Sequence, residues 1–336
     1  GLTTAYWSPD GTLLTTLAAS SDPAHGIVDV DSGATFALGL PTPVADPSPY
    51  FYGSRISATA DRRIGWTAVP GFDADDQFVV AAYGHEKFTN ADLTSFQQIH
   101  ADVYLLPPSP GATPIHLTNL PYDPVASDGT HTIRYAWDPV WLPPSSDDPA
   151  DRAWVLYRYQ EISLDRSRST GSVTVDEHVR LMEIDTSTWP LVGSADVLSD
   201  EPLTGWPTAV GELDKLVFAG DRSVVAWNES GDVYSTTVTM VTDTRYDAGE
   251  RPDIAFSLAG SALSLPSTSS GLAWSMSTPL GGVDQDGEWV SLTMRDGQPY
   301  VVKLDGSGWL QVVKDKKRER DRSNVYAMGF RPPSGS

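Results

Sequence analysis

The stretch Trp7-Ser8-Pro9-Asp10-Gly11 separates two apolar segments near the start of the chain, at residues 3–7 and 12–18. Proline presets φ for the second position of a turn, aspartate accepts hydrogen bonds from nearby backbone, and glycine tolerates a positive φ. Runs of β-forming residues on both sides of such a turn indicate antiparallel strands. The stretch therefore predicts a β-hairpin.

Short strand-like segments separated by turn residues recur from this hairpin onward. The opening unit has four of them, at residues 3–7, 12–18, 26–30 and 35–38, and four short strands are typical of one β-propeller blade. We therefore predict an all-β chain that forms a single β-propeller domain over residues 1–336. Six four-stranded antiparallel blades fit best, and five, seven or eight remain open. The expected blades are residues 3–40, 50–120, 131–198, 203–242, 253–280 and 281–314.

The end of the chain is similar to its beginning. Residues 325–335 hold a strand-like segment, an aromatic residue and a proline turn, as residues 4–11 do. A C-terminal strand that completes the first blade of a propeller closes the ring and removes exposed sheet edges. We therefore expect a closing strand at residues 325–331 in the same blade as residues 3–7.

Two polar insertions interrupt the second and third units. In the first, residues 70–101, Asn90 can cap a helix and Leu93, Phe96 and Ile99 are spaced by three. This pattern predicts a short helix over residues 90–100. The second insertion, residues 163–177, is expected to be a loop. Both are candidate partner-binding segments, because loops on a rigid scaffold commonly carry recognition.

Composition narrows the classes of partner. Of the 336 residues 40% are apolar, enough for a substantial core, and no apolar run is long enough for a transmembrane helix. The net charge of −21 disfavours nucleic acid and anionic membrane surfaces as partners. The chain has no cysteine, which excludes disulfides, thiolate metal sites and cysteine nucleophiles.

Three stretches carry a family resemblance. Trp7-Ser8-Pro9-Asp10-Gly11 is followed in the next unit by Asp102-Val103-Tyr104-Leu105 and Ile115-His116-Leu117-Thr118-Asn119. They resemble the two halves of the PD40 repeat of TolB-like (WD40-like) propellers. The five-residue motif is complete once, and the units from residue 203 onward depart from the repeat. The resemblance implies a binding scaffold in an extracytoplasmic setting, whether secreted, periplasmic or at the cell surface.

Three tryptophans are candidate partner-binding residues. Most of the 11 tryptophans lie within strand-like segments, where packing between blades is expected. Trp137, Trp141 and Trp206 lie near proline-rich connections, and aromatic side chains of an exposed face commonly form interaction hot spots.

One acidic loop is a candidate calcium site. Asp284, Asp286 and Glu288 offer three carboxylates on a turn, and carboxylate oxygen is the ligand that calcium prefers. An Asp-Gly pair is also a common hairpin turn, so a purely structural turn remains the alternative. No other cofactor is expected, since no histidines are paired at metal-ligand spacing and no Gly-x-Ser-x-Gly motif is present.

These observations favour a non-enzymatic, extracytoplasmic binding or scaffold module that contacts a protein partner. A third candidate contact is residues 314–322, with six basic and three acidic residues in an acidic chain. Two alternatives remain open. One is a glycoside-active propeller with two carboxylates in its central funnel, and the other is a structural subunit of a larger cell-surface assembly.

Overall fold

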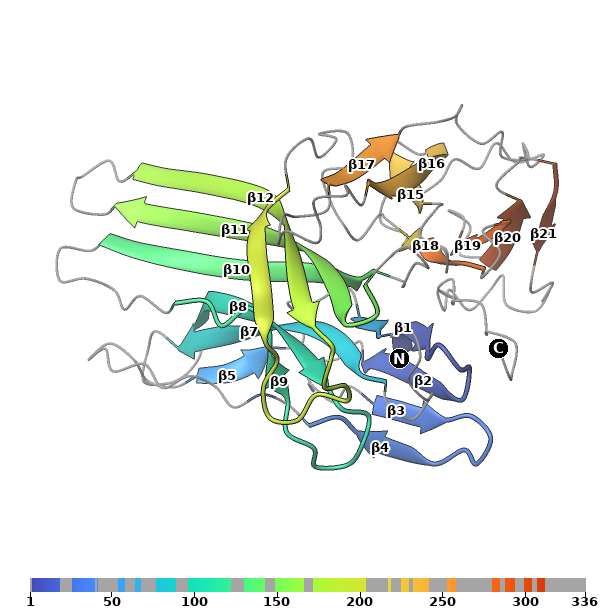
Figure 1. Ribbon diagram of the computed structural model, residues 1–336, viewed down its shortest axis with the longest axis horizontal. Helices are drawn as coiled ribbons and strands as arrows, with labels where there is room; N and C mark the ends of the chain where they lie inside the picture. Colours follow the sequence, from blue (N-terminus) through green and yellow to red (C-terminus); the bar gives the residue numbers. More distant parts are fainter. Residues whose placement is uncertain are drawn as a thin grey trace.

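The regular structure of this chain is made of β-strands (Figure 1). The computed structural model describes residues 2–18, 26–39, 41, 54–57, 64–67, 77–88, 96–121, 130–142, 149–165, 172–203, 217–218, 225–229, 232–241, 253–257, 280–284, 288–293, 299–303 and 307–311. Within these ranges every regular element is a strand, so the predicted all-β class is confirmed. No helix capable of crossing a membrane occurs among these residues.

The first sheet agrees with the strands predicted for the opening unit. Its four antiparallel strands follow chain order: β1 (Leu2–Trp7), β2 (Leu13–Ala18), β3 (Gly26–Asp29) and β4 (Thr35–Ala37). Gly11 has a φ of +70°, the left-handed conformation that the hairpin turn needs and that glycine adopts without strain. Its backbone N–H donates to the carbonyl of Ser8 at 2.9 Å.

Asp10 holds this turn together. Its carboxylate accepts hydrogen bonds from the Ser8 hydroxyl (2.5 Å), the Thr12 hydroxyl (2.5 Å) and the Thr12 N–H (3.1 Å). The Ser8 hydroxyl in turn accepts the N–H of Leu13 at 2.9 Å. Burial raises the pKa of Asp10, but hydrogen bonds from Ser8, Thr12 and Gln77 outweigh it and leave the pKa below its usual value.

A nine-stranded sheet forms the centre of the molecule. Its path is β13-β12-β11-β10-β8-β7-β5, with β6 paired to β7 and β9 to β8. The strands are β5 (Ser54–Ser57), β6 (Ile64–Trp66), β7 (Val79–Phe88), β8 (Phe96–Leu106), β9 (Ile115–His116), β10 (Thr130–Trp141), β11 (Arg152–Asp165), β12 (Ser172–Asp185) and β13 (Val197–Pro202).

One short parallel contact makes this sheet continuous. Arg134 and Tyr135 of β10 lie opposite His100 and Ala101 of β8, and the other pairings of the sheet are antiparallel. The sequence placed these strands in two separate four-stranded blades. They are joined instead because β8 and β10, of 11 and 12 residues, are long enough to meet.

The predicted helix over residues 90–100 is wrong for its described part. Residues 96–100 begin β8, which pairs with β7 from Phe88↔Phe96 to Val79↔Leu106. Residues 70–101 are likewise not a loop where they are described, because Phe78 and the first residues of β7 are core residues. A spacing of three is compatible with either element, and long-range strand pairing decided between them.

Two apolar clusters cover opposite faces of β7 and β8. Val80, Ala82, Val103 and Leu105 point into the larger cluster, with residues of β10, β11 and β12. The alternate residues Val79, Ala81, Tyr104 and Leu106 point into a second cluster with Ile27 and Leu38 of the first sheet. The period of two along each strand thus builds a sheet buried on both faces.

Two further four-stranded sheets follow the central sheet in the sequence. The first is β14 (Val217–Phe218), β15 (Val225–Glu229), β16 (Asp232–Val241) and β17 (Asp253–Ser257); the second is β18 (Leu280–Val283), β19 (Trp289–Thr293), β20 (Pro299–Lys303) and β21 (Trp309–Gln311). β17 pairs with β16, whereas the sequence assigned it to the next unit. The expected closing strand, residues 325–331, lies outside the described residues.

We expect Asp10→Ala to lower the free energy of unfolding by about 1–2 kcal/mol, because three donors lose their acceptor. Folding lowers the pKa of Asp10. The contribution of Asp10 to the free energy of unfolding is therefore complete above its pKa in the unfolded chain, about 3.9, and is lost as pH falls through its pKa in the folded protein. Urea unfolding at pH 7, 4 and 2.5 measures both effects. Glu201→Ala, at an exposed site on β13, is the control, and an Asp10→Ala effect that does not shrink on acidification contradicts this account.

Candidate binding surface

The central sheet extends beyond the core as a three-stranded arm. We define the arm as residues 130–137 of β10, 158–165 of β11 and 172–179 of β12, which project together in Figure 1. In β11 the residues from Ala153 to Tyr157 are buried, whereas those from Arg158 to Ser163 are half-buried. In β12 the residues from Ser172 to Glu177 are all exposed. The arm is therefore the continuation of a core sheet into solvent.

One face of the arm carries an aromatic pair. Tyr135 and Trp137 are two apart on β10, so their side chains share a face, and their rings stack with centroids 5.0 Å apart at 19°. Residues directly opposite in register share that face. It therefore includes the register partners Arg158, Gln160, Ile162, Val173, Val175 and Glu177. We call this set, with Tyr135 and Trp137, the aromatic face.

Polar groups hold the aromatic face in place. Arg158 lies opposite Trp137, and its guanidinium nitrogens are 3.8 Å from an Asp138 oxygen and 3.5 Å from a Glu177 oxygen. The Gln160 amide donates to Glu177 at 3.2 Å. Burial raises the pKa of Tyr135 to about 12, so this phenol stays neutral at physiological pH.

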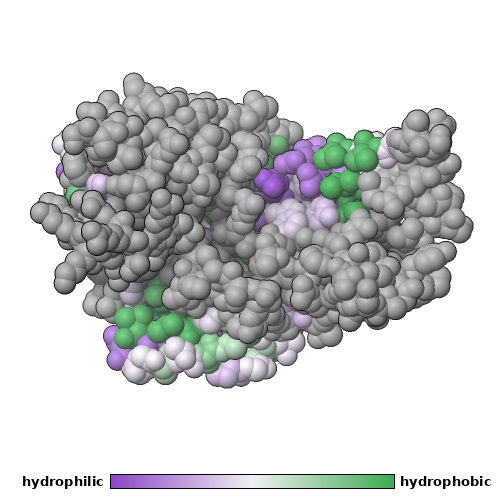
Figure 2. Space-filling model, turned by 180° about the vertical axis from the view of Figure 1, so that it is seen from behind, coloured by the Kyte–Doolittle hydropathy of each residue, from purple (hydrophilic) through white to green (hydrophobic). Residues whose placement is uncertain are grey.

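Two valines extend the apolar part of this face to its end. Val173 is 64% exposed and Val175 is 53% exposed, although both are large apolar side chains. Figure 2, seen from behind, shows green apolar and purple polar atoms side by side over the region of the arm. A mixed apolar and charged surface of this kind is typical of interaction sites.

The opposite face of these strands carries two tyrosine–carboxylate–arginine groups, of which the first lies next to the base of the arm. The Tyr157 hydroxyl donates to both carboxylate oxygens of Asp200 (2.7 and 2.8 Å), and Arg180 Nε donates to Asp200 at 2.9 Å.

The second group lies farther out on the arm. Tyr159 and Arg134 each donate to Glu161 at 2.9 Å, and the guanidinium of Arg180 lies 5.2 Å from the centre of the Tyr159 ring. Burial raises the pKa of Tyr159, and its hydrogen bond to Glu161 adds to the shift. These contacts join β10, β11, β12 and β13 on this face of the sheet.

The structure separates the three candidate tryptophans. Trp137 is half-buried and lies on the aromatic face, and its role in binding stays a prediction. Trp141 is only 5% exposed and packs in the core with its ring centroid 5.7 Å from that of Trp189, so the prediction of an exposed face is wrong for it. Trp206 lies outside the described residues.

The candidate calcium loop is described in part. Asp284 accepts the backbone N–H groups of Glu288 and Trp289, each at 2.8 Å, which is the geometry of a turn capped by its own aspartate. Asp286 lies outside the described residues. Among the residues that the structure describes, no cluster of three or more histidine or acidic side chains could hold a metal ion. Calcium binding therefore stays a prediction.

The three candidate contact segments have different outcomes. The described parts of residues 70–101 include β7 and the start of β8, and residues 77–84 and 101 are buried. The described residues of the segment 163–177, which are 163–165 and 172–177, are the outer ends of β11 and β12 and form part of the arm. Residues 314–322 lie outside the described residues. Sequence reasoning missed Tyr135, Val173 and Val175, although the spacing of two between Tyr135 and Trp137 is a signal for one shared strand face.

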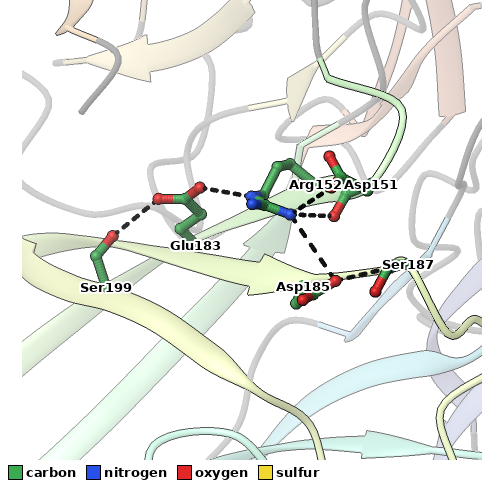
Figure 3. A network of polar contacts seen from close by, with 6 residues as sticks. All are labelled: Asp151, Arg152, Glu183, Asp185, Ser187 and Ser199. Atoms are coloured by element: carbon green, nitrogen blue, oxygen red, sulfur yellow. Dashed lines mark hydrogen bonds and ion pairs between the residues drawn. The ribbon is translucent and has the colours of Figure 1, made fainter. Parts of the chain in front are cut away.

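A charged network lies at the end of β11 that is farthest from the arm. Arg152 lies between two groups of carboxylates (Figure 3), with Nε 3.1 Å from Glu183 and Nη1 2.9 Å from Asp151 and 3.8 Å from Asp185. The Ser187 N–H donates to Asp185 at 2.8 Å. Hydrogen bonds from Ser187 and the charge of Arg152 lower the pKa of Asp185.

A shallow hollow of about 330 Å³ lies beside this network. It is lined by Asp185, Thr188, Pro190, Leu191, Val192, Ser194 and Asp196. No aromatic side chain lines it, whereas a sugar-binding hollow commonly presents one for stacking. Because Asp185 already bonds Ser187 and faces Arg152, this network is structural in character.

Comparisons with known proteins add little to this geometry. No protein family matches the chain, and no curated protein sequence matches it. The β-propeller domain of Cps50 (Swd1) from Myceliophteria thermophila is 10% identical, with 94% of this chain and 88% of that one covered and a TM-score of 0.34. Sqt1 from Saccharomyces cerevisiae is 7% identical, with 92% and 72% covered and a TM-score of 0.27. At these TM-scores the likeness supports no argument, and the all-β class rests on the described strands.

We expect Arg152→Met to lower the free energy of unfolding by about 1 kcal/mol, since partly exposed ion pairs contribute modestly. In a double-mutant cycle with Glu183→Gln, the double variant should lose about 0.5–1 kcal/mol less than the sum of the two single losses, because each substitution removes the same contact. Urea unfolding of the wild type, the two single variants and the double variant gives the coupling free energy. Repeating it at low and high salt shows how far salt screens the ion pair. Fully additive losses would show that the pair contributes nothing.

Proposed function

We propose that this chain is a non-enzymatic protein-binding module and that the aromatic face of the arm is its contact surface. The observation that carries the proposal is the stacked, half-buried pair of Tyr135 and Trp137 beside the exposed Val173 and Val175. Tyrosine, tryptophan and arginine dominate the binding energy of protein interfaces. All three occur on this face, with Arg158 opposite Trp137.

The side-chain contacts within the arm support a binding role. Association costs free energy whenever side chains or strands must be ordered on contact. On this face Arg158 and Gln160 are already held by Glu177, and the strand beneath them is fastened from its other face by Asp200 and Glu161. A partner would therefore meet a surface that is organised before contact.

The finer identity of the scaffold is part of the same proposal. We infer a propeller-like arrangement of the TolB-like or WD40-like kind, in an extracytoplasmic setting. Three sheets of four antiparallel strands in chain order support it, as does the Trp7–Gly11 turn. The continuous central sheet is a departure from separate blades.

A structural subunit of a larger assembly is the second candidate. The exposure of Val173 and Val175 favours it as well, because a permanent interface would cover the same apolar surface. The two functions differ in the lifetime of the complex: a subunit would be isolated together with its neighbour, whereas a binding module would exchange partners.

We expect Trp137→Ala and Tyr135→Ala each to weaken partner binding by at least about 30-fold, as the loss of a hot-spot aromatic does. The immobilised chain is used to capture proteins from extracts of its source cells, and each captured protein is quantified against the variants. The fold should persist, because both side chains are half-buried on the arm rather than in the core.

The matched control is Trp289→Ala, which removes a half-buried tryptophan that lies outside the central sheet and contacts Lys303. This variant should retain every captured protein. If both arm variants retain them too, the aromatic face is not the contact surface and the proposal is wrong.

A further inference from the structure

We propose that the outer edge of β12 at residues 172–178 accepts an added β-strand from a partner, and that this strand is an extended basic segment. The inference rests on the proposed function and says how the partner is held. Strand addition to a sheet edge is a general mode of peptide recognition, in which backbone hydrogen bonds give affinity and alternate side chains give specificity.

The neighbouring strand β13 covers only the inner part of β12. Register partners run from Ile184↔Val197 to Arg180↔Pro202, and one more bond, from the Leu203 N–H to the Val179 carbonyl at 2.7 Å, ends the contact. Among the described residues no strand pairs with the outer edge of residues 172–178. These residues are exposed except for the half-buried His178.

Two backbone hydrogen bonds of β12 identify the groups that face this edge. The Val179 carbonyl bonds Leu203, and the Asp185 N–H bonds the carbonyl of Asp196, both on the outer side of β12. In an antiparallel strand the N–H and C=O of one residue point to the same edge, and the next residue's point to the other. The outward groups therefore belong to Val173, Val175 and Glu177.

The edge is held in the extended form that an added strand requires. β12 pairs with β11 without a register shift from Arg152↔Asp185 to Asp165↔Ser172. Proteins usually protect exposed edges with proline, charged side chains (lysine above all) or a bulge. The segment from Ser172 to His178 contains no proline and no lysine, and its charged side chains, Asp176 and Glu177, oppose an acidic incoming strand but not a basic one.

The side chains along the edge define the chemistry of the incoming strand. Val173 and Val175 flank it on the aromatic face, whereas Asp176, with a side chain 64% exposed, flanks it on the opposite face and contacts His178 at 2.8 Å. Directly opposed cross-strand side chains stabilise a pair when both are apolar or when their charges are opposite. The best occupant therefore alternates β-branched and basic residues.

Charge decides between a basic partner and a second copy of this chain. A second copy would also carry a net charge of −21 and would bring its own Asp176 and Glu177 to the contact. Repulsion between such charges opposes association, whereas a basic segment is attracted. The occupant of this edge is therefore a basic segment rather than a second copy of the chain.

The test uses the full chain and an acetylated, labelled ten-residue peptide in which lysine alternates with valine or threonine. Fluorescence anisotropy should show saturable binding to the wild type. Val175→Pro removes an outward N–H but leaves the β11 ladder intact, since proline is tolerated at an edge, and it should weaken binding at least tenfold. Val175→Thr keeps both the N–H and the branched side chain, so binding should change less than threefold.

A second probe keeps the test independent of how Val175→Pro folds. The same peptide, N-methylated at every residue, cannot donate backbone hydrogen bonds from either of its edges and should lose at least tenfold in affinity for the wild-type chain. Equal binding of the two peptides would mean attraction by charge alone and would overturn strand addition. Absence of binding by the parent peptide, or self-association of the chain that Val175→Pro abolishes, would overturn it too.

The two proposals fail in different ways. If Trp137→Ala abolishes partner capture while Val175→Pro leaves it unchanged, the aromatic face binds the partner and the edge does not. If the peptide binds as expected but Trp137→Ala has no effect on partner capture, the edge accepts a strand and the proposed contact surface is wrong.

Discussion

The unbroken pairing of β11 with β12 is the interaction on which the central sheet and its arm depend. Fourteen residues of each strand stay in one register, so the inner half, packed in the core, determines the position of the outer half in solvent. The inner residues Val155, Tyr157, Met182 and Ile184 belong to the main apolar cluster. A strand of this length spans about 45 Å, and its outer half extends beyond the buried residues as the arm.

A bulge in β10 explains why only one of two neighbouring tryptophans is available for binding. Trp137 and Trp141 are four apart, so a regular strand would place both on the same face. The register shifts between Trp137 and Val140, and Asp138 has a φ of +49°. The extra residue of a bulge inverts the alternation, which sends Trp141 into the core. The Asp138-Pro139 pair within a strand is the sequence signal of this bulge.

Local patterns predicted the parts of the fold that local chemistry determines. The turn at Trp7–Gly11 and the four strands of the first sheet follow from proline, aspartate, glycine and alternating β-formers. The parallel contact of Arg134 and Tyr135 with His100 and Ala101 has no local signal, because it joins segments that are distant in the chain. The helix expected over residues 90–100 failed for the same reason. Pairing with β7 outweighed a short local periodicity.

The two faces of the arm have divided roles, and this division follows from strand alternation. Tyr157 and Tyr159 point to one face, where their hydroxyls donate hydrogen bonds to Asp200 and Glu161. Arg158 and Gln160 point to the other face, beside the aromatic pair. Polar groups that satisfy one another stabilise the arm without covering the aromatic face. A free-standing two-stranded hairpin is at best marginally stable in water, so an exposed apolar face needs a third strand and such a fastened back to persist in solution.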